Sequence, residues 1–189
     1  KMDILGADFN HVCDMIRDRL KNNPVAIQYP IGKEDTFSGI IDLMTLRAEV
    51  YTSEDGKEYE DRDVPAEMLD EVQAARDAMI EAICETDDEL TMKYLEGEEL
   101  THDEIVQGFR AGMKDGSIVP VVPVSALTGI GVATLLNTIA NYMHSPAEIV
   151  AEAVNPKNDE KIERACSADE PFSAFVFKTI ADPFVGKLS

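Results

Sequence analysis

The sequence predicts an α/β fold, because a buried strand, a polar turn and an amphipathic helix follow one another near its middle. Residues 118–124 are a nearly continuous apolar run rich in β-branched residues, typical of a strand buried on both faces of a parallel sheet. The turn runs from Ser125 to Gly131. Apolar residues then recur at helical spacing, at Val132, Leu135, Leu136, Ile139 and Met143. Ligands of α/β sheets gather where such strands end, which is where Ser125-Ala126-Leu127 lies.

Length and charge bound the classes of function. The 189 residues are enough for one domain or for parts of two. The formal net charge of −20 would repel nucleic-acid phosphates, so we expect no direct nucleic-acid binding. The same charge favours a basic protein partner. Because no apolar run approaches the length of a membrane span, we expect no membrane association.

Cysteines and histidines give no sign of a metal site or of a disulfide framework. The three cysteines are scattered and odd in number, which favours reduced thiols in the cytoplasm. The three histidines show no metal-ligand spacing with them, so we expect no metal to be held. The chain begins with Lys1 and stops within a pattern, and we expect it to be a piece of a longer protein.

The first half of the chain reads as one helix followed by strands. An apolar helical face runs from Phe9 to Leu20, and Asn22-Asn23-Pro24 should end the helix near Lys21. Residues 25–31, 37–43 and 47–52 read as strands. A hairpin turn around Asp55-Gly56 follows, and residues 58–63 form a charged edge or loop.

Three helices are predicted next. Pro65 suits the first position of a helix that carries an apolar stripe down to Cys84. Asp87 can cap a second helix through Leu90 and Tyr94 to Glu96. Thr101 and Glu104 form a capping-box pattern that opens a third helix, with Ile105 and Phe109 facing inwards.

The end of the chain reads as a linker and the start of a further domain. Residues 145–170 carry Pro146, Asn155-Pro156 and a run of charges, with no clear period. Residues 172–180 alternate, with Phe175 and Phe177 on one face, which predicts the first strand of a new β domain.

Two short motifs at strand ends carry the chemistry. Lys1-Met2-Asp3 and Ser125-Ala126-Leu127 resemble the two guanine-reading motifs of GTP-binding proteins, whose first pattern is Asn-Lys-x-Asp. The Asp3 carboxylate can accept hydrogen bonds from the ring N–H and the amino group of guanine, a donor pair that adenine lacks. The stem of Lys1 can cover the base. The Ala126 N–H can donate to the guanine carbonyl, and Ser125 can hold the loop in shape.

More than a hundred residues separate the two motifs. This long insert restricts the families of GTP-binding proteins that the chain can resemble. Further stretches carry a closer resemblance: Lys1-Met2-Asp3 with Gly6-Ala7-Asp8-Phe9, Asn23-Pro24-Val25, residues 30–43, residues 93–100, residues 169–174 and residues 182–188. In these stretches the chain resembles bacterial translation elongation factor G. The resemblance covers essentially the whole chain.

The resemblance implies a division of the chain into five parts. Residues 1–21 and 115–145 would be the end of a P-loop GTPase domain, and residues 22–114 an inserted α+β subdomain called G prime. Residues 146–167 would be a linker, and residues 168–189 the start of a β-barrel domain II. Lys1, Asp3, Ser125, Ala126 and Leu127 would form the guanine-binding site, and no residue of this chain is expected to be catalytic.

The resemblance also implies the activity of the full protein. GTP hydrolysis with magnesium would drive tRNA and mRNA movement on the ribosome, in the cytoplasm, with the insert contacting the ribosomal stalk protein. Two alternatives stay open: a non-catalytic acidic module that recruits a ribosomal partner, or a piece of another translational GTPase, such as a recycling or ribosome-protection factor. Around the second motif, family members commonly read Cys-Gly-Ser-Ala-Phe-Lys-Asn-Lys-Gly. This chain keeps Ser125-Ala126 and lacks the basic residues, which suggests a diverged paralogue.

Catalysis by the chain alone is not expected. No Gly-x-x-x-x-Gly-Lys-Ser/Thr pattern occurs in it, so nothing in the sequence predicts a loop that cradles phosphates. Acidic pairs such as Asp87-Asp88, Glu98-Glu99 and Asp169-Glu170 are better explained as solvated surface than as acid–base pairs, since the chain has 37 acidic residues. His102 fits the first turn of a helix.

Overall fold

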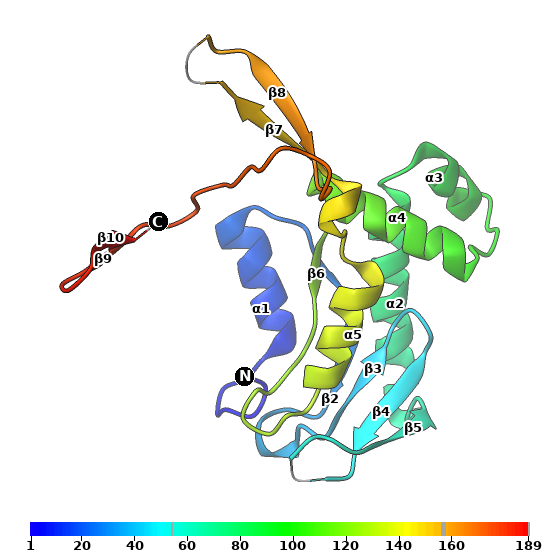
Figure 1. Ribbon diagram of the computed structural model, residues 1–189. Coiled ribbons are helices and arrows are strands. Elements are labelled where there is room, and N and C mark those ends of the chain that lie inside the picture. Colours follow the sequence, from blue (N-terminus) through cyan, green and yellow to red (C-terminus); the bar gives the residue numbers. More distant parts are fainter. Residues whose placement is uncertain (54, 156–157, 189) are drawn as a thin grey trace. The chain divides into compact units, whose positions relative to one another are not determined.

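The computed structural model describes residues 1–53, 55–155 and 158–188. These residues form a mixture of helices and sheets, which confirms the α/β class in its general form (Figure 1). The chain divides into two compact units, Lys1–Met143 and His144–Ser189, each described by itself. The finer division into domains stays a prediction.

The first element is a short helix, α1 (Phe9–Met15), continued by one π-helical turn, η1 (Ile16–Leu20). The Asp8 carboxylate caps α1 by accepting from the His11 N–H. Lys21 adopts a left-handed φ of 57° and ends the helix, as the breaker residues predict. Phe9 is buried, but Leu20 is 65% exposed, so the predicted apolar face is only partly covered within this chain.

The parallel strand predicted at residues 118–124 forms, but it is short. Strand β6 (Val119–Val121) pairs in parallel with β1 (Pro24–Ala26), and its residues are half-buried. The prediction of one strand over residues 25–31 is wrong, because the chain changes sheets at Ile27. The Ile27 N–H donates to the Val121 carbonyl and its own carbonyl accepts from Leu43, so it joins β6 to the neighbouring sheet.

That neighbouring sheet is antiparallel and four-stranded. Its order is β2 (Gln28–Ile31), β3 (Gly39–Asp42), β4 (Arg47–Tyr51) and β5 (Tyr59–Asp63). A short turn, η2 (Glu34–Thr36), joins β2 to β3. The two predicted strands and the charged edge are confirmed: β5 is fully exposed, and Arg47 of β4 pairs with Asp61 and Asp63 on it.

The three predicted helices are α2 (Leu69–Cys84), α3 (Asp88–Leu95) and α4 (His102–Asp115). Pro65 lies before the short turn η3 (Ala66–Met68) and not at the first position of the long helix. The caps are confirmed, because Asp87 accepts from two N–H groups at the start of α3 and Thr101 and Glu104 cap each other at α4. The core between these helices holds fully buried apolar side chains, among them Val72, Met79, Ile83, Ile105 and Phe109.

The last helix of this unit, α5 (Val132–Tyr142), is the amphipathic helix predicted after residues 118–124. Its apolar stripe is only partly covered, since Leu136 is 61% exposed and Ile139 46%. The buried residue of α5 is Thr134, which faces the four-stranded sheet and donates to Glu49 of β4. Arg110 of α4 donates to the Tyr142 carbonyl at 3.0 Å, where a cation suits the helix C-terminus.

The second unit corrects two predictions. The predicted linker over 146–167 contains the turn η4 (Pro146–Glu148) and an antiparallel hairpin of β7 (Val150–Val154) and β8 (Lys161–Ala165). Charged residues lie on both faces of β8, at Lys161, Glu163 and Arg164, so this segment shows no clear alternation in the sequence. The predicted strand over 172–180 is wrong except at its end, because residues 172–179 are not paired with another strand. A second hairpin follows, with β9 (Ile180–Asp182) and β10 (Gly186–Leu188).

Candidate functional site

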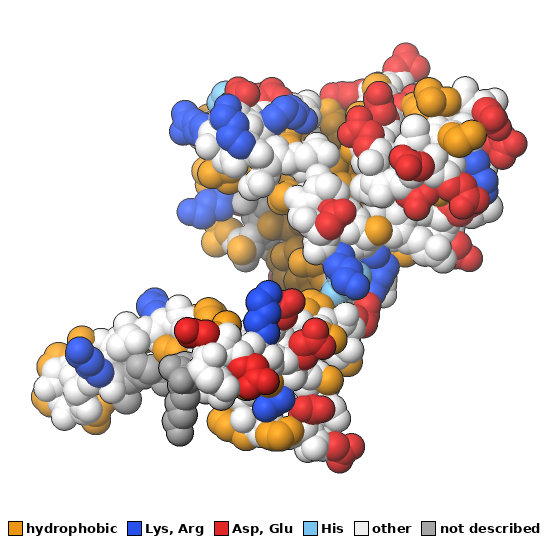
Figure 2. Space-filling view, turned by 90° about the horizontal axis from the view of Figure 1, so that it is seen from above, with side chains coloured by type: hydrophobic (Ala, Val, Ile, Leu, Met, Phe, Trp, Pro, Cys, Tyr) orange, Lys and Arg blue, Asp and Glu red, His pale blue; other side chains and the backbone are white. Residues whose placement is uncertain are grey.

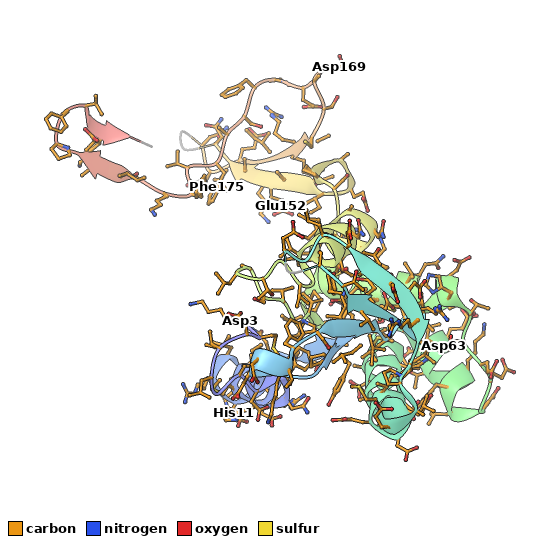
Figure 3. The ribbon with its side chains drawn as sticks, turned by 90° about the horizontal axis from the view of Figure 1, so that it is seen from below. Asp3, His11, Asp63, Glu152, Asp169 and Phe175 are labelled. Atoms are coloured by element: carbon orange, nitrogen blue, oxygen red, sulfur yellow. The ribbon has the colours of Figure 1, made fainter. Side chains whose placement is uncertain are left out.

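The two motifs singled out in the sequence lie against each other. The Ser125 hydroxyl donates to Asp3 Oδ1 at 2.6 Å, although the residues are 122 positions apart. The Met2 N–H donates to the Val124 carbonyl at 3.1 Å, which fixes the first loop beside the end of the strand run. Asp3 lies in the loop before α1 (Figure 3), and Ser125 follows β6. The fold therefore brings together residues that the sequence could only place at separate strand ends.

Asp3 is a negatively charged acceptor at neutral pH. The hydrogen bond from Ser125, followed by its own backbone N–H, holds the pKa of Asp3 below the usual value of 3.8. A carboxylate has two oxygens and about four acceptor positions, of which the Ser125 hydroxyl uses one. Asp3 can therefore accept from a further pair of donors.

The Ser125 side chain organises the second loop. It is fully buried, and its hydroxyl oxygen also accepts from the Thr128 N–H at 3.2 Å. The Ser125 N–H donates to the Ile130 carbonyl at 3.0 Å, which closes the loop on itself. Ala126 and Leu127 within this closed loop are exposed, and so is Lys1, so a ligand can reach all three. This arrangement gives Ser125 the loop-holding geometry expected from the sequence.

Two residues of the insert, Glu34 and Gly56, also touch these loops, and the sequence assigned neither of them a role at the site. The Glu34 N–H donates to the Met2 carbonyl at 2.8 Å, and the Glu34 carboxylate accepts from the Gly6 N–H at 2.7 Å. Gly56, in the turn between β4 and β5, lies against the backbone of residues 128–130. The turn at Asp55-Gly56 was predictable from local sequence. Its distant contact carries no local signal.

Other reactive side chains form no comparable constellation. Burial raises the pKa of the Cys13 and Cys84 thiols, which keeps them protonated and unreactive at neutral pH. Among residues 1–53, 55–155 and 158–188, no three His, Cys, Asp or Glu side chains come together as metal ligands would. Asp87 is a helix cap and His102 begins α4, as the sequence indicates.

Two cavities in the described residues bear on where a ligand could bind. One, of about 930 Å³, lies in the second unit between the β7–β8 hairpin and Ser173–Phe175, and none of the motif residues lines it. A smaller one, about 330 Å³, lies beside the first loop and is lined mainly by apolar groups of residues 1–8, α1 and residues 121–124.

None of the helices in the described residues combines the length and the apolar character needed to cross a bilayer.

Comparisons with known proteins support a shared fold and give no activity. No protein-family profile matches the sequence. The chain is similar to a crystal structure of a protein from Thermus thermophilus, with 30% sequence identity and a TM-score of 0.68 over 96% of this chain. The chain spans only 24% of the length of that protein, whose name states no function. The local chemistry of the two loops must therefore carry any functional argument.

Proposed function

We propose that the loops around Asp3 and Ser125 read the guanine base of GTP in a larger GTP-binding protein. The observation that carries this proposal is the 2.6 Å hydrogen bond from Ser125 to Asp3. It joins two motifs at one edge of the fold, where the end of a parallel strand leaves ligand-binding loops. In the full protein, the phosphates and magnesium would be held by residues outside this chain.

The chemistry of the site fits guanine. The ionised Asp3 carboxylate accepts from the ring N–H and the amino group of guanine, while the backbone N–H of Ala126, an exposed residue, donates to the guanine carbonyl. The aliphatic stem of Lys1 covers the base and leaves its ammonium in water. A site built from such paired polar groups rejects a base that lacks the matching donors by roughly 10⁴-fold or more.

The larger protein that we propose is a translational GTPase resembling elongation factor G or one of its paralogues. It would act in the cytoplasm on the ribosome and use GTP hydrolysis to drive translocation. The long insert between the two motifs supports this choice over smaller GTP-binding proteins. Because the chain has no phosphate-cradling pattern, we expect it alone to hydrolyse no GTP and to bind GTP more weakly than micromolar.

A titration of the isotope-labelled chain with guanosine monophosphate (GMP) tests this proposal directly. GMP carries the base without requiring a triphosphate site, so weak binding to the isolated loops is measurable by amide chemical shifts. We expect saturable shifts at Asp3, Ala126 and Thr128 with GMP, and none of comparable size with adenosine monophosphate. Equal responses to the two nucleotides, or shifts confined to other parts of the chain, would refute guanine reading.

A second function is favoured by the charge of the insert. In Figure 2, Asp and Glu side chains gather on the side of the first unit that carries α3 and α4. Exposed acidic residues also lie along α2 and at its C-terminal cap, including Asp77, Glu81 and Glu85. We propose that this face docks a basic protein partner, and the resemblance points to the ribosomal stalk protein. Electrostatic attraction of this kind speeds association and weakens with salt.

A further inference from the structure

The insert reaches both candidate base-reading loops through two turns of one sheet. The turn Gly32–Thr36 follows β2, and a turn at residues 55–57 follows β4. Because β2 and β4 each pair antiparallel with β3, they run in the same direction, and both turns lie at the same end of the sheet. Figure 1 shows the N-terminal loop and the loop after β6 next to this end. We infer that the sheet is a clamp in which Glu34 and Gly56 are positioning residues for base recognition.

Glu34 holds the first loop at two points, one before Asp3 and one after it. Its N–H donates to the Met2 carbonyl at 2.8 Å, directly before Asp3, and its carboxylate accepts from the Gly6 N–H at 2.7 Å. Glu34 has a left-handed φ of 56°, which a non-glycine residue adopts only where surrounding contacts enforce it. The Thr36 hydroxyl, bonded to both the N–H and the carbonyl of Lys33, closes the turn that enforces it.

Gly56 holds the second loop by close backbone approach. A Cβ placed on Gly56 would lie 2.4 Å from the Gly129 carbonyl carbon and 2.6 Å from the Ile130 nitrogen. A Cβ on Gly129 would likewise lie 2.3 Å from the Asp55 carbonyl oxygen. The turn itself is held by the Ser53 hydroxyl, which accepts from the N–H groups of Lys57 and Glu58 at 3.0 Å each. Only a residue without a side chain fits at this contact.

A third contact fixes the sheet to the helix after the second loop. Glu49 of β4 accepts hydrogen bonds from the Thr134 hydroxyl of α5 and, at 3.4 Å, from the Tyr51 hydroxyl. One rigid sheet thus contacts both loops and α5. Since a base is read only when acceptor and donors stand within about half an ångström of their working positions, the spacing of the loops should control affinity. This inference rests on the proposed function.

The first test replaces Glu34 in the isotope-labelled chain and measures GMP binding by amide shifts. Glu34→Ala removes the acceptor for Gly6, while Glu34→Gln keeps an acceptor, and both retain a side chain at the left-handed position. We expect Glu34→Ala to weaken GMP binding roughly 3- to 10-fold and Glu34→Gln to restore part of it. Asp35→Ala, at the adjacent exposed carboxylate, should leave binding unchanged.

The second test compares two glycines that share a left-handed backbone. Gly56 has φ +64° and backbone atoms against it, whereas Gly97 has φ +77° and open space around it. Alanine at either position meets similar backbone strain. Only Gly56→Ala should shift the amide signals of Gly129 and Ile130 and weaken GMP binding, by roughly 3-fold or more. Thermal unfolding of each variant shows that the fold is retained, and Glu34→Gln remains informative if Gly56→Ala fails to fold.

The outcomes separate this inference from the proposed function. If the unmodified chain binds GMP but Glu34→Ala and Gly56→Ala bind it as well as their controls do, the clamp is wrong and guanine reading stands. If the unmodified chain shows no GMP response at Asp3 or Ala126, the proposed function falls and the clamp falls with it. Weaker binding in both variants, with partial rescue by Glu34→Gln and with both controls unchanged, supports the clamp.

Discussion

The insert has two ends that are built in different ways. Its turn end, formed by Gly32–Thr36 and residues 55–57, contacts the loops around Asp3 and Ser125 through backbone groups, a glycine and the Glu34 carboxylate. Its helical end, formed by α2, α3 and α4, packs into the apolar core that it shares with the sheet, and its outer surface carries exposed acids. The turn end therefore depends on close steric fit to the two loops, whereas the helical end presents a negatively charged surface. Mutations at the two ends should therefore separate base recognition from partner docking.

The largest expected effect comes from the core of the helical end. Phe109 is fully buried and packs edge-on against Tyr142, with ring centroids 5.6 Å apart. Phe109→Ala should lower the free energy of unfolding by about 3–5 kcal/mol, measured by denaturant titration. Phe175→Ala is the matched control, since that ring is 86% exposed and its loss should change little. Equal effects of the two variants would contradict the assignment of Phe109 to the core.

Charge reversal on the helical end should weaken docking without touching base recognition. We expect Glu81→Lys with Glu85→Lys to reduce association with the stalk protein roughly 10-fold at low salt, and less at high salt. Glu71 is a poorer choice, because its carboxylate accepts from the Tyr29 hydroxyl. Asp35→Lys with Glu58→Lys makes the same change of charge at the turn end. If that control pair weakens association equally, net charge decides docking and the helical end has no special role.

The ion pair between Lys93 and Glu104 at the helical end predicts that part of the stability is lost at low pH. Lys93, followed by the backbone N–H and the hydroxyl of Thr101, lowers the pKa of Glu104 from 4.5 to about 2. The stability that this carboxylate contributes is fully present above pH 4.5 and is lost as the pH falls towards 2. Glu104→Gln should therefore melt below the unmodified chain at neutral pH, and the difference should shrink on acidification. A difference that stays constant with pH would exclude the ion pair as its cause.

Glu49 of β4, which accepts a hydrogen bond from Thr134 of α5, should have the smallest effect on stability, with a pH dependence opposite to that of Glu104. Burial is the main cause that raises its pKa above 4.5, with Asp42 and Asp61 adding to it, against the hydroxyls of Thr134 and Tyr51. Its protonation therefore adds stability as the pH falls through the raised pKa towards 4.5. Glu49→Gln should be slightly more stable than the unmodified chain at neutral pH and should lose that advantage on acidification. Thermal unfolding across a pH series tests this. A Glu49→Gln variant that is less stable than the unmodified chain at neutral pH would contradict the prediction.

Local signals in the sequence predicted much of this fold. The caps at Asp87 and Thr101 were predictable because a side chain there bonds the backbone only a few residues away. The break at Ile27 was not, since it depends on carbonyl and N–H partners in two different sheets. Alternation at Phe175 and Phe177 predicted a strand, but alternation alone supplies no pairing partner.

The candidate site divides in the same way. Asp3 and Ser125 could be singled out from short motifs at strand ends, where ligands of α/β sheets bind, but their direct hydrogen bond is seen only in the folded structure. The roles of Glu34 and Gly56 could not be predicted, because local patterns placed both residues only in turns and their contacts join loops far apart in the chain. Such positioning contacts are set by tertiary packing, and only the folded structure reveals them.

The most direct test of the central claim exchanges the acceptor that would read the base. Asp3→Asn turns one carboxylate oxygen into an amide donor, which suits the carbonyl that xanthine carries in place of the guanine amino group. Titration with GMP and xanthosine monophosphate should show the unmodified chain preferring GMP, and Asp3→Asn preferring the xanthine nucleotide by roughly 10-fold. Ser125→Ala should weaken both nucleotides, and Asp8→Asn, at the cap of α1, should change neither. If Asp3→Asn keeps its preference for GMP, Asp3 does not read guanine and the proposed function is contradicted.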